Sequence, residues 1–306
     1  MKVGIIGAGG IGGYFAGILR RIGVEVRLVA RGDHLAAIQS RGLEIRTAND
    51  TYVVQVDAAE DGDFLRGCDY VIVAVKGYSL PEIAPMTVAA AKSGAAIVPL
   101  LNGVDIVQQL EAHGVPPASI IGGLAKISVF RIEPGVIERK SPFQRATLGE
   151  FDRTRSDRVK RLVDVLEQAG MDANISGDIG LDLWRKFAFI VPMTVACGLS
   201  REPAGRVNAT DRGRALVASS LHEIVEVSRA VGVALSDADE AQVKADLYAL
   251  PAGMYPSFYM DLVRGGPAET ETLAGAVSRL GRAHGIPTPV HDVATAAFEV
   301  ATLPRS

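Results

Sequence analysis

Lys186 stands in an otherwise apolar stretch of the second half of the chain, LWRKFAFIVPMTVACGL, and its side chain can deliver a proton. At helical spacing its face carries the apolar neighbours Leu183, Ile190, Met193 and Cys197. Burial disfavours the charged form of a lysine, so it lowers the pKa of the ammonium toward the range of proton transfer near neutrality. Lys186 is therefore a candidate catalytic acid. The alternative is a lysine whose alkyl stem lies on apolar surface while its ammonium stays in water.

Glu269 is the matching acidic candidate. We expect it at the N-terminal end of a helix over residues 270–283, where the helix dipole favours a carboxylate. It continues an apolar stripe formed by Leu273, Ala276 and Leu280. This spacing predicts that Glu269 points inward as a second catalytic residue. The alternative is a carboxylate that caps the helix and binds no ligand.

Ser257 and Asp261 are spaced four residues apart and share one face of a helix expected over residues 257–264. They could present a hydroxyl and a carboxylate to a polar substrate. They could equally begin and solvate a short helix. No metal site is expected, because the five histidines and two cysteines show no ligand spacing.

A glycine-rich turn near the start of the chain is a candidate binding site for a dinucleotide. The run VGIIGAGGIG contains Gly7-x-Gly9-x-x-Gly12, between a strand over residues 2–6 and a helix over residues 11–22. Glycine turns also occur for packing reasons alone. The succession of strand, glycine turn and helix is the context that indicates a dinucleotide-binding site.

Each residue of this turn has an expected role. Gly7 permits the tight turn, Gly9 lets the backbone approach a pyrophosphate, and Gly12 lets the helix pack closely on the sheet. Gly10 directly precedes the helix and Ile11 begins it, and the free N–H groups and positive dipole end of that helix favour phosphate. We therefore expect all five residues to bind the cofactor.

The residue after the second expected strand, residues 25–30, indicates which nucleotide binds. An acidic residue usually takes the ribose 2′-hydroxyl of NAD at this place, but here the strand runs into Arg31. A guanidinium makes paired, charge-assisted hydrogen bonds to a 2′-phosphate, so Arg31 favours NADPH. Asp33 keeps NAD open, and Arg31 could also be a solvated loop charge.

Two polar residues follow buried strands of the first half. Lys76 follows YVIVAV and Asn102 follows AIVPLL. Ligands of doubly wound sheets lie outside the carboxyl ends of the strands, so we expect both residues near the nicotinamide end of the cofactor, with Asn102 also near the substrate. Asn102-Gly103 is also a good turn dipeptide, which is the alternative.

The order of strand-like and helix-like segments predicts the fold class. The first half alternates the two, which predicts a Rossmann-type α/β domain with a parallel sheet. Expected strands are residues 2–6, 25–30, 70–75 and 95–101, with a hairpin-like excursion at 43–46 and 52–57 and partly antiparallel strands between 120 and 148. Expected later helices are residues 155–168, 180–200, 212–231, 237–250, 257–264, 270–283 and 290–301. We therefore expect an NADP-binding domain over residues 1–177 and an all-α substrate and catalytic domain over residues 178–306.

Composition narrows the classes of partner. A net charge of −3, spread along 306 residues, gives no basic surface for nucleic acid and no polybasic membrane patch. Cys68 and Cys197 are too few for a disulfide framework, and no signal segment precedes the first strand, so a cytoplasmic location is expected. The longest apolar stretch is too short to span a bilayer and is broken by Pro192.

Together these motifs resemble the ketopantoate reductase (2-dehydropantoate 2-reductase) family along nearly the whole chain. The matching segments, in order, are GAGGIGG, Arg31 with His34-Leu35, Lys76, Asn102-Gly103, Trp184-Arg185-Lys186-Phe187, Ser257 with Asp261, Pro267-Ala-Glu269-Thr-Glu271 with Gly275, and Gly285-Ile-Pro-Thr-Pro289. The glycine motif is shared with many dehydrogenases. The Trp-x-Lys and Pro-x-Glu-x-Glu segments are much more specific.

The resemblance implies a reaction and roles for single residues. It implies NADPH-dependent reduction of 2-dehydropantoate to pantoate, on the route to pantothenate and coenzyme A, in a cleft between the domains. It further implies that Lys186 is the acid near the reacting carbonyl and that Glu269 supports catalysis. Asn102 and Ser257 would help to hold the substrate.

One departure leaves the substrate open. Members of the family carry asparagines about four and eight residues after the catalytic lysine, where this chain has Ile190 and Thr194. The site loses an amide donor, so a different, less polar 2-oxo acid is one alternative. A protein that senses NADPH without turnover is another. The apolar C-terminal helices could form a homodimer surface or only a second core.

Overall fold

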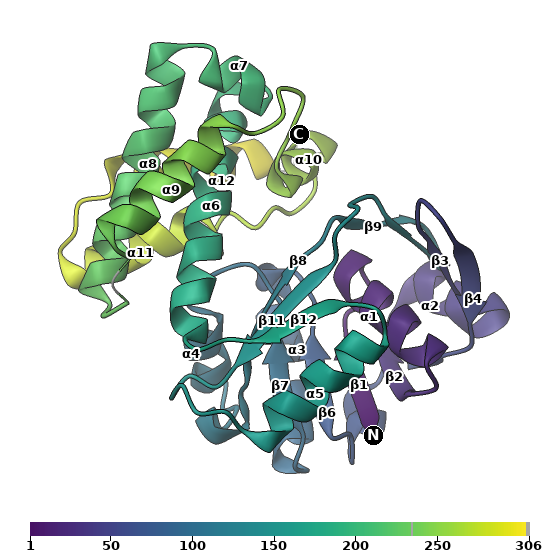
Figure 1. The fold of residues 1–306 in the computed structure, drawn as a ribbon. Helices are drawn as coiled ribbons and strands as arrows, with labels where there is room; N and C mark the ends of the chain where they lie inside the picture. Colours follow the sequence, from purple (N-terminus) through teal and green to yellow (C-terminus); the bar gives the residue numbers. More distant parts are fainter. Residues whose placement is uncertain (234, 304–306) are drawn as a thin grey trace. The chain divides into compact units, whose positions relative to one another are not determined.

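The computed structural model describes residues 1–233 and 235–303 and divides the chain into two compact units. The first comprises Met1–Leu101 and Ile106–Ile179, and the second comprises Asn102–Asp105 and the chain from Gly180 onward. The short segment that carries Asn102 therefore clusters with the helical unit, although it follows a strand of the first. Figure 1 shows the parallel sheet of the first unit and the helices of the second.

A five-stranded parallel sheet of order β5-β2-β1-β6-β7 is the centre of the first unit. The strands are β1 Lys2–Ile6, β2 Glu25–Val29, β5 Asp57–Ala59, β6 Tyr70–Val73 and β7 Ala96–Pro99. Strands β6 and β7 are buried along their whole length, which is why they appear in the sequence as continuous apolar runs without alternation. The predicted parallel α/β sheet is confirmed.

Helices and two smaller sheets complete this unit. The helices are α1 Gly10–Arg21, α2 Gly32–Arg41, α3 Leu80–Lys92, α4 Ile106–Ala112 and α5 Asp157–Gln168. One sheet has the order β4-β3-β10-β9, with β3 Leu43–Arg46, β4 Thr51–Val54, β9 Val129–Glu133 and β10 Val136–Arg139. The other has the order β12-β11-β8, with β8 Gly122–Lys126, β11 Arg145–Gly149 and β12 Asp172–Ile175.

The expected hairpin at residues 43–46 and 52–57 is only partly right. Strands β3 and β4 do pair antiparallel. Residues 57–59, however, form the separate strand β5, which pairs parallel with β2 in the main sheet. Its three residues are too few for a periodic pattern to mark the change of sheet.

The second unit is helical in the part that the structure describes. Its helices are α6 Ile179–Ser200, α7 Ala204–Asn208, α8 Asp211–Ala230, α9 Asp237–Tyr248, α10 Ser257–Arg264, α11 Ala274–His284 and α12 Pro289–Thr302. Helix α6 continues through Pro192. Helix α11 begins at Ala274, four residues later than predicted, because Thr270–Leu273 form turns.

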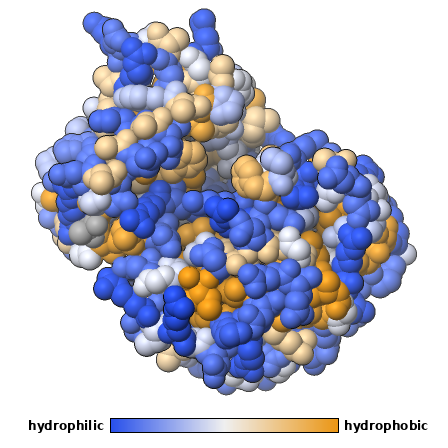
Figure 2. All heavy atoms as spheres, viewed as in Figure 1, coloured by the Kyte–Doolittle hydropathy of each residue, from blue (hydrophilic) through white to orange (hydrophobic). Residues whose placement is uncertain are grey.

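The buried apolar side chains of the described residues form three clusters, two in the first unit and one in the second. The face drawn in Figure 2 is largely hydrophilic, with small, scattered apolar patches. Within the described residues no helix is long and apolar enough to cross a membrane. No cluster of three or more metal-ligating side chains occurs there either.

Candidate functional site

Gly7 and Gly12 are glycines because the fold leaves no room for a side chain. Gly7 has a φ of +99°, and a Cβ there would lie 2.8 Å from the carbonyl oxygen of Ala74. A Cβ on Gly12 would lie 1.9 Å from the carbonyl oxygen of Gly7. These two positions set the turn between β1 and α1 and the close approach of the helix to the sheet.

Gly9 has a different reason to be glycine. Its φ of −69° and ψ of −165° suit any residue, and a Cβ there would have no atom of the described chain within 4 Å. Gly9 is the N-cap of α1, with no side-chain cap from the described residues and no acidic residue in the first turn. The N-terminal end of α1 thus offers backbone N–H groups and a positive dipole end to an anion, and Gly9 leaves the space beside it open.

Gly10 is less clearly a cofactor residue than the sequence suggested. A Cβ on Gly10 would lie 2.4 Å from the carbonyl oxygen of Val129, so packing of α1 against β9 alone requires glycine. Ile11 is half-buried and packs against the core of the first unit. A cofactor role for these two residues stays a prediction.

Arg31 is the N-cap of α2 and directly follows the second strand region, as the sequence predicted. Its guanidinium is exposed and forms an ion pair with Glu82 of α3. Both side chains are about 60% exposed (61% and 59%), and an exposed pair of this kind contributes at most about 1 kcal/mol. A dianionic phosphate could therefore replace Glu82 at small cost.

Lys76 and Asn102 follow β6 and β7, at the carboxyl ends of those strands. Lys76 is half-buried and begins a 3₁₀ turn over Gly77–Ser79. Asn102 is also half-buried, and its segment is grouped with the helical unit.

The start of α6 separates two neighbouring charges. Arg185 is exposed and pairs with Asp239 of α9 at 2.8 Å. Lys186, one residue on, is half-buried next to the buried rings of Trp184 and Phe187, which meet edge to face at 5.8 Å. Arg185 is thus the more exposed of the two charges, and Lys186 is the one that lies partly among apolar side chains.

Thr194 does not replace a lost amide donor. Its side chain is buried, and its hydroxyl donates to the backbone carbonyl of Ile190 at 2.8 Å. That bond occupies the only donor of the threonine. Between them, Ile190 and Thr194 make this face of α6 apolar toward a ligand.

Glu269 is buried, at 3% exposure, but it does not lie at a helix N-terminus. It precedes the turns at residues 270–273, and its backbone carbonyl accepts from the amide of Leu273 at 3.1 Å. The expected inward direction therefore agrees with its burial, whereas the expected help from the α11 dipole is wrong.

Arg279 of α11 ties the Asn102 segment to the Glu269 turn, and sequence reasoning missed it. Its guanidinium binds Asp105 at 2.6 Å, the Glu271 carboxylate at 3.0 Å and the Glu271 carbonyl at 3.3 Å. Asp105 is three residues after Asn102, and Glu271 is two residues after Glu269. No helical spacing links these acids to Arg279, so the sequence carried no signal for the cluster.

The Arg279 cluster is expected to contribute to the free energy of unfolding. Asp105 is buried, and one of its oxygens has no partner among the residues that the structure describes. The Arg279→Met change removes the guanidinium from the other oxygen, so we expect a loss of about 2 kcal/mol in the free energy of unfolding, measured in urea. The matched control is Arg282→Met, at an exposed position of the same helix, with a change within about 0.5 kcal/mol. Equal losses in the two variants would contradict a specific role for the Arg279 cluster.

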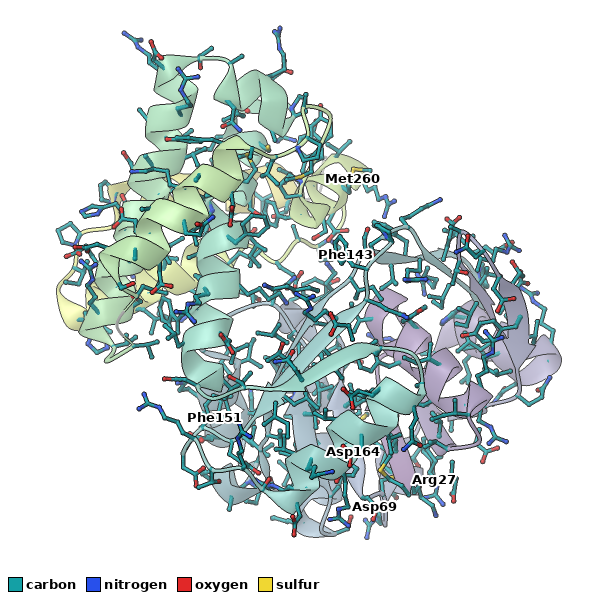
Figure 3. All side chains as sticks on the ribbon, viewed as in Figure 1. Arg27, Asp69, Phe143, Phe151, Asp164 and Met260 are labelled. Atoms are coloured by element: carbon teal, nitrogen blue, oxygen red, sulfur yellow. The ribbon has the colours of Figure 1, made fainter. Side chains whose placement is uncertain are left out.

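Ser257 and Asp261 lie on α10, the helix marked by Met260 in Figure 3. Ser257 is exposed and Asp261 is half-buried. Two contacts hold this helix against its neighbours. The Tyr259 hydroxyl donates to the carbonyl of Arg201 at 3.2 Å, and the rings of Phe258 and Phe298 pack with their centroids 4.8 Å apart. Its predicted bounds, residues 257–264, are confirmed.

The candidate residues divide between the two units. The glycine turn, Arg31 and Lys76 belong to the first unit, and Asn102, Lys186, Ser257, Asp261 and Glu269 belong to the second. Three neighbours of the latter group, Val104, Ile190 and Ala268, pack against the single core of the helical unit. One packed body therefore carries the proposed acid, its supporting carboxylate and the asparagine.

A second set of polar residues has the connectivity of a hydrolase triad but is closed. Ser220 lies 3.1 Å from His291 Nε2, and His291 Nδ1 lies 2.5 Å from Glu223. Ser220 and His291 are completely buried, and Glu223 is 7% exposed. Glu223 also accepts from the amides of Val290 and His291 at 2.8 and 3.2 Å. This network anchors the first turn of α12 and leaves the serine out of reach of a substrate.

A parallel α/β unit with a glycine turn before its first helix, followed by an all-α unit, defines a class of two-domain oxidoreductases. The family description "Ketopantoate reductase PanE/ApbA" matches residues 3–153, and "Ketopantoate reductase PanE/ApbA C terminal" matches residues 178–301. The chain belongs to the ketopantoate reductase family.

Individual relatives agree over nearly the whole chain. A 2-dehydropantoate 2-reductase of Mesorhizobium japonicum is 30% identical over 97% of this chain and 96% of its own. The crystal structure of a PanE/ApbA family ketopantoate reductase from Ralstonia eutropha has a TM-score of 0.89 at 26% identity and covers 99% of this chain and 98% of its own. A ternary structure of D-mandelate dehydrogenase with NADH and anilino(oxo)acetate has a TM-score of 0.89 at 23% identity, covering 99% and 98%, which shows a shared fold.

Proposed function

We propose that the protein is an NADPH-dependent reductase of a 2-oxo acid, with 2-dehydropantoate as the substrate and pantoate as the product. The observation that carries the proposal is Gly9, which the fold does not require, beside the uncapped N-terminus of α1. A pyrophosphate fits such a place in charge and in the space it needs. Family membership supplies the reaction class.

The residues of the first unit would hold the cofactor. The amides at the start of α1 would bind the pyrophosphate beside Gly9, and Arg31 would bind the 2′-phosphate. Lys76, at the carboxyl end of β6, would lie toward the nicotinamide. When bound, NADPH supplies the hydride for reduction of the carbonyl carbon.

The residues of the second unit would hold the oxo acid and supply the proton. Asn102 and Ser257 would bind the carboxylate or the hydroxyl of the substrate through hydrogen bonds. The ammonium of Lys186 would stabilise the negative charge that develops on the carbonyl oxygen and donate a proton to it. Glu269 would orient that ammonium or a water from its buried turn.

A different oxo acid is the second candidate, favoured by one observation. Ile190 is apolar and the Thr194 hydroxyl is bound to its own helix, so this face of α6 gives no donor to a hydroxylated substrate. D-mandelate dehydrogenase, which shares the fold, was crystallised with anilino(oxo)acetate, an oxo acid derivative with an aromatic group. An apolar wall discriminates weakly against such substrates.

A substrate panel separates the two candidates. NADPH oxidation would be followed with 2-dehydropantoate, 2-oxoisovalerate and benzoylformate, and kcat/KM compared. We expect the largest kcat/KM with 2-dehydropantoate. A larger kcat/KM with either of the other two acids would favour the second candidate instead. A protein that binds NADPH, oxidises it with none of the panel and changes its association with another protein would be a sensor.

Arg31 makes a prediction about cofactor choice. We expect Arg31→Ala to raise KM for NADPH about 10-fold through loss of charge-assisted bonds to the 2′-phosphate, with KM for NADH within about twofold. In Glu82→Gln the competing carboxylate is removed, so KM for NADPH should stay equal or fall. Equal losses for NADPH and NADH in Arg31→Ala would exclude a 2′-phosphate contact.

A further inference from the structure

His34 joins three segments of the first unit that are far apart in the chain. Its Nε2 lies 2.7 Å from the carbonyl oxygen of Ala8, in the glycine turn. Its Nδ1 accepts from the backbone amide of Gly135, in the turn between β9 and β10, at 2.8 Å. The His34 side chain is 4% exposed. His34 lies in the first turn of α2, three residues after the N-cap Arg31.

These two partners fix the protonation state of the ring. A backbone amide can only donate, so the Nδ1 of His34 carries no proton, and a carbonyl can only accept, so its Nε2 carries one. The ring is therefore a neutral bridge with a defined tautomer. Burial, together with the positive charge of Arg131 on β9, lowers the pKa of His34 below its ordinary value of 6.5, against the raising effect of the Ala8 carbonyl.

The bond to Ala8 acts on the peptide next to Gly9. The peptide group is planar and trans, so its N–H points opposite to its C=O. Holding the Ala8 carbonyl toward His34 therefore turns the Gly9 N–H to the other side, away from α2. The bond to Gly135, by contrast, secures the β9–β10 turn and touches no part of the glycine turn.

We propose that His34 is a positioning residue for the dinucleotide: its Nε2–H bond to Ala8 holds the Ala8–Gly9 peptide in the orientation that receives the pyrophosphate. This proposal rests on the proposed function, since it assumes that the glycine turn binds NADPH. It adds a residue outside the glycine motif, and a pH dependence of cofactor affinity. A second proton, on Nδ1, would set its N–H against the N–H of Gly135, so the ring would have to move, and its Nε2–H would move away from Ala8 with it.

The electrostatic surroundings of His34 give this pH dependence its direction. Arg131 on β9 opposes protonation. The first turn of α1 has no acidic residue, and on α2 the neighbouring ionisable residues are Asp33 and the N-cap Arg31. The Pro134–Gly135 turn follows Glu133, and the guanidinium of Arg41 on α2 donates to the Pro134 carbonyl. Because the folded state disfavours the proton, the contribution of His34 is complete above about pH 6.5 and is lost as the pH falls toward its lower folded value.

Two substitutions separate the two hydrogen bonds. Glutamine places its amide nitrogen where His34 has Nε2, so His34→Gln keeps the donor to Ala8 and loses the acceptor for Gly135. Asparagine places its amide group where His34 has Nδ1, so His34→Asn keeps a partner for Gly135 and loses the bond to Ala8. Each variant loses one buried bond, and we expect similar shifts of the urea midpoint.

The experiment titrates NADPH into the full-length wild type and both variants at pH 7.5, and into the wild type and His34→Gln between pH 5 and 8. We expect His34→Asn to raise the NADPH Kd by roughly 3- to 10-fold and His34→Gln to stay within about twofold, with kcat at saturating NADPH unchanged in both. We also expect the wild-type Kd to rise more steeply than that of His34→Gln as the pH falls through the folded-state pKa of His34, which lies below 6.5.

The outcomes are distinguishable. A wild type that binds no NADPH at pH 7.5 overturns the proposed function and this inference with it. A wild type that binds NADPH, with Kd values for the two variants that rise equally or not at all, overturns the inference alone. If His34→Asn does not fold, the pH profiles decide: parallel profiles of wild type and His34→Gln overturn the inference, and diverging profiles support it.

Discussion

Replacing Lys186 by alanine is expected to lower kcat for reduction of the 2-oxo acid about 1000-fold, with the NADPH Kd within about twofold. The reason is that the ammonium acts on charge that develops only as hydride reaches the carbonyl carbon. Lys186 lies on the helical unit, whereas the expected cofactor residues other than Asn102 lie on the first unit. The measurement is steady-state NADPH oxidation together with NADPH binding by fluorescence.

Arg185 supplies the matched control for this prediction. It is the neighbouring cation on the same helix, but it is exposed and bound to Asp239 and Asp182. Arg185→Ala should retain kcat within about threefold, since surface ion pairs contribute little. Nearly full turnover in Lys186→Ala, or equal losses in both variants, would remove Lys186 from the proton-transfer step.

The second large effect is expected for Gly9→Ala. Its backbone angles suit alanine, and the added methyl group meets no atom of the described chain, so the fold should tolerate it. The methyl group would occupy the space in which a pyrophosphate approaches the amides of α1. We expect the NADPH Kd to rise about 100-fold, the value of one or two lost charge-assisted hydrogen bonds.

Gly177→Ala is the control for that change. Gly177 lies in the same unit, and a Cβ there also meets no described atom. Both variants should unfold in urea within about 1 kcal/mol of the wild type, because Gly9 is an N-cap, where alanine costs about that much, and Gly177→Ala adds a methyl group that meets no described atom. NADPH affinity that is unchanged in Gly9→Ala would mean that the glycine turn does not hold the cofactor.

The sequence predicted the elements whose patterns are long or sharply bounded. Strand β1 and helix α10 have the predicted bounds. Strand β1 ends at the glycine turn, and α10 lies between Pro256 and Gly265. Strand β5 was missed because it has three residues, and only pairing with β2 makes it a strand.

The residue types of the candidate site could be predicted from the sequence, but the contacts that hold those residues in place could not. Glu269 was expected at the N-terminal end of α11, close to the helix dipole. The helix begins only at Ala274, and the residues between Glu269 and the helix form turns that include the buried Thr270 and Thr272. The Arg279–Asp105 contact joins residues 174 positions apart, and the His34–Gly135 contact joins residues 101 positions apart. Such contacts depend on tertiary packing, and no local pattern in a single sequence records them.

A single-turnover experiment shows whether this chain reduces a 2-oxo acid with NADPH. Excess protein would be mixed with NADPH and 2-dehydropantoate, and the absorbance of the reduced nicotinamide followed while the product is identified by mass. We expect loss of that absorbance with one equivalent of pantoate formed, and neither event in Lys186→Ala on the same timescale. NADPH that binds and stays reduced in the presence of 2-dehydropantoate and the other oxo acids of the panel would contradict it.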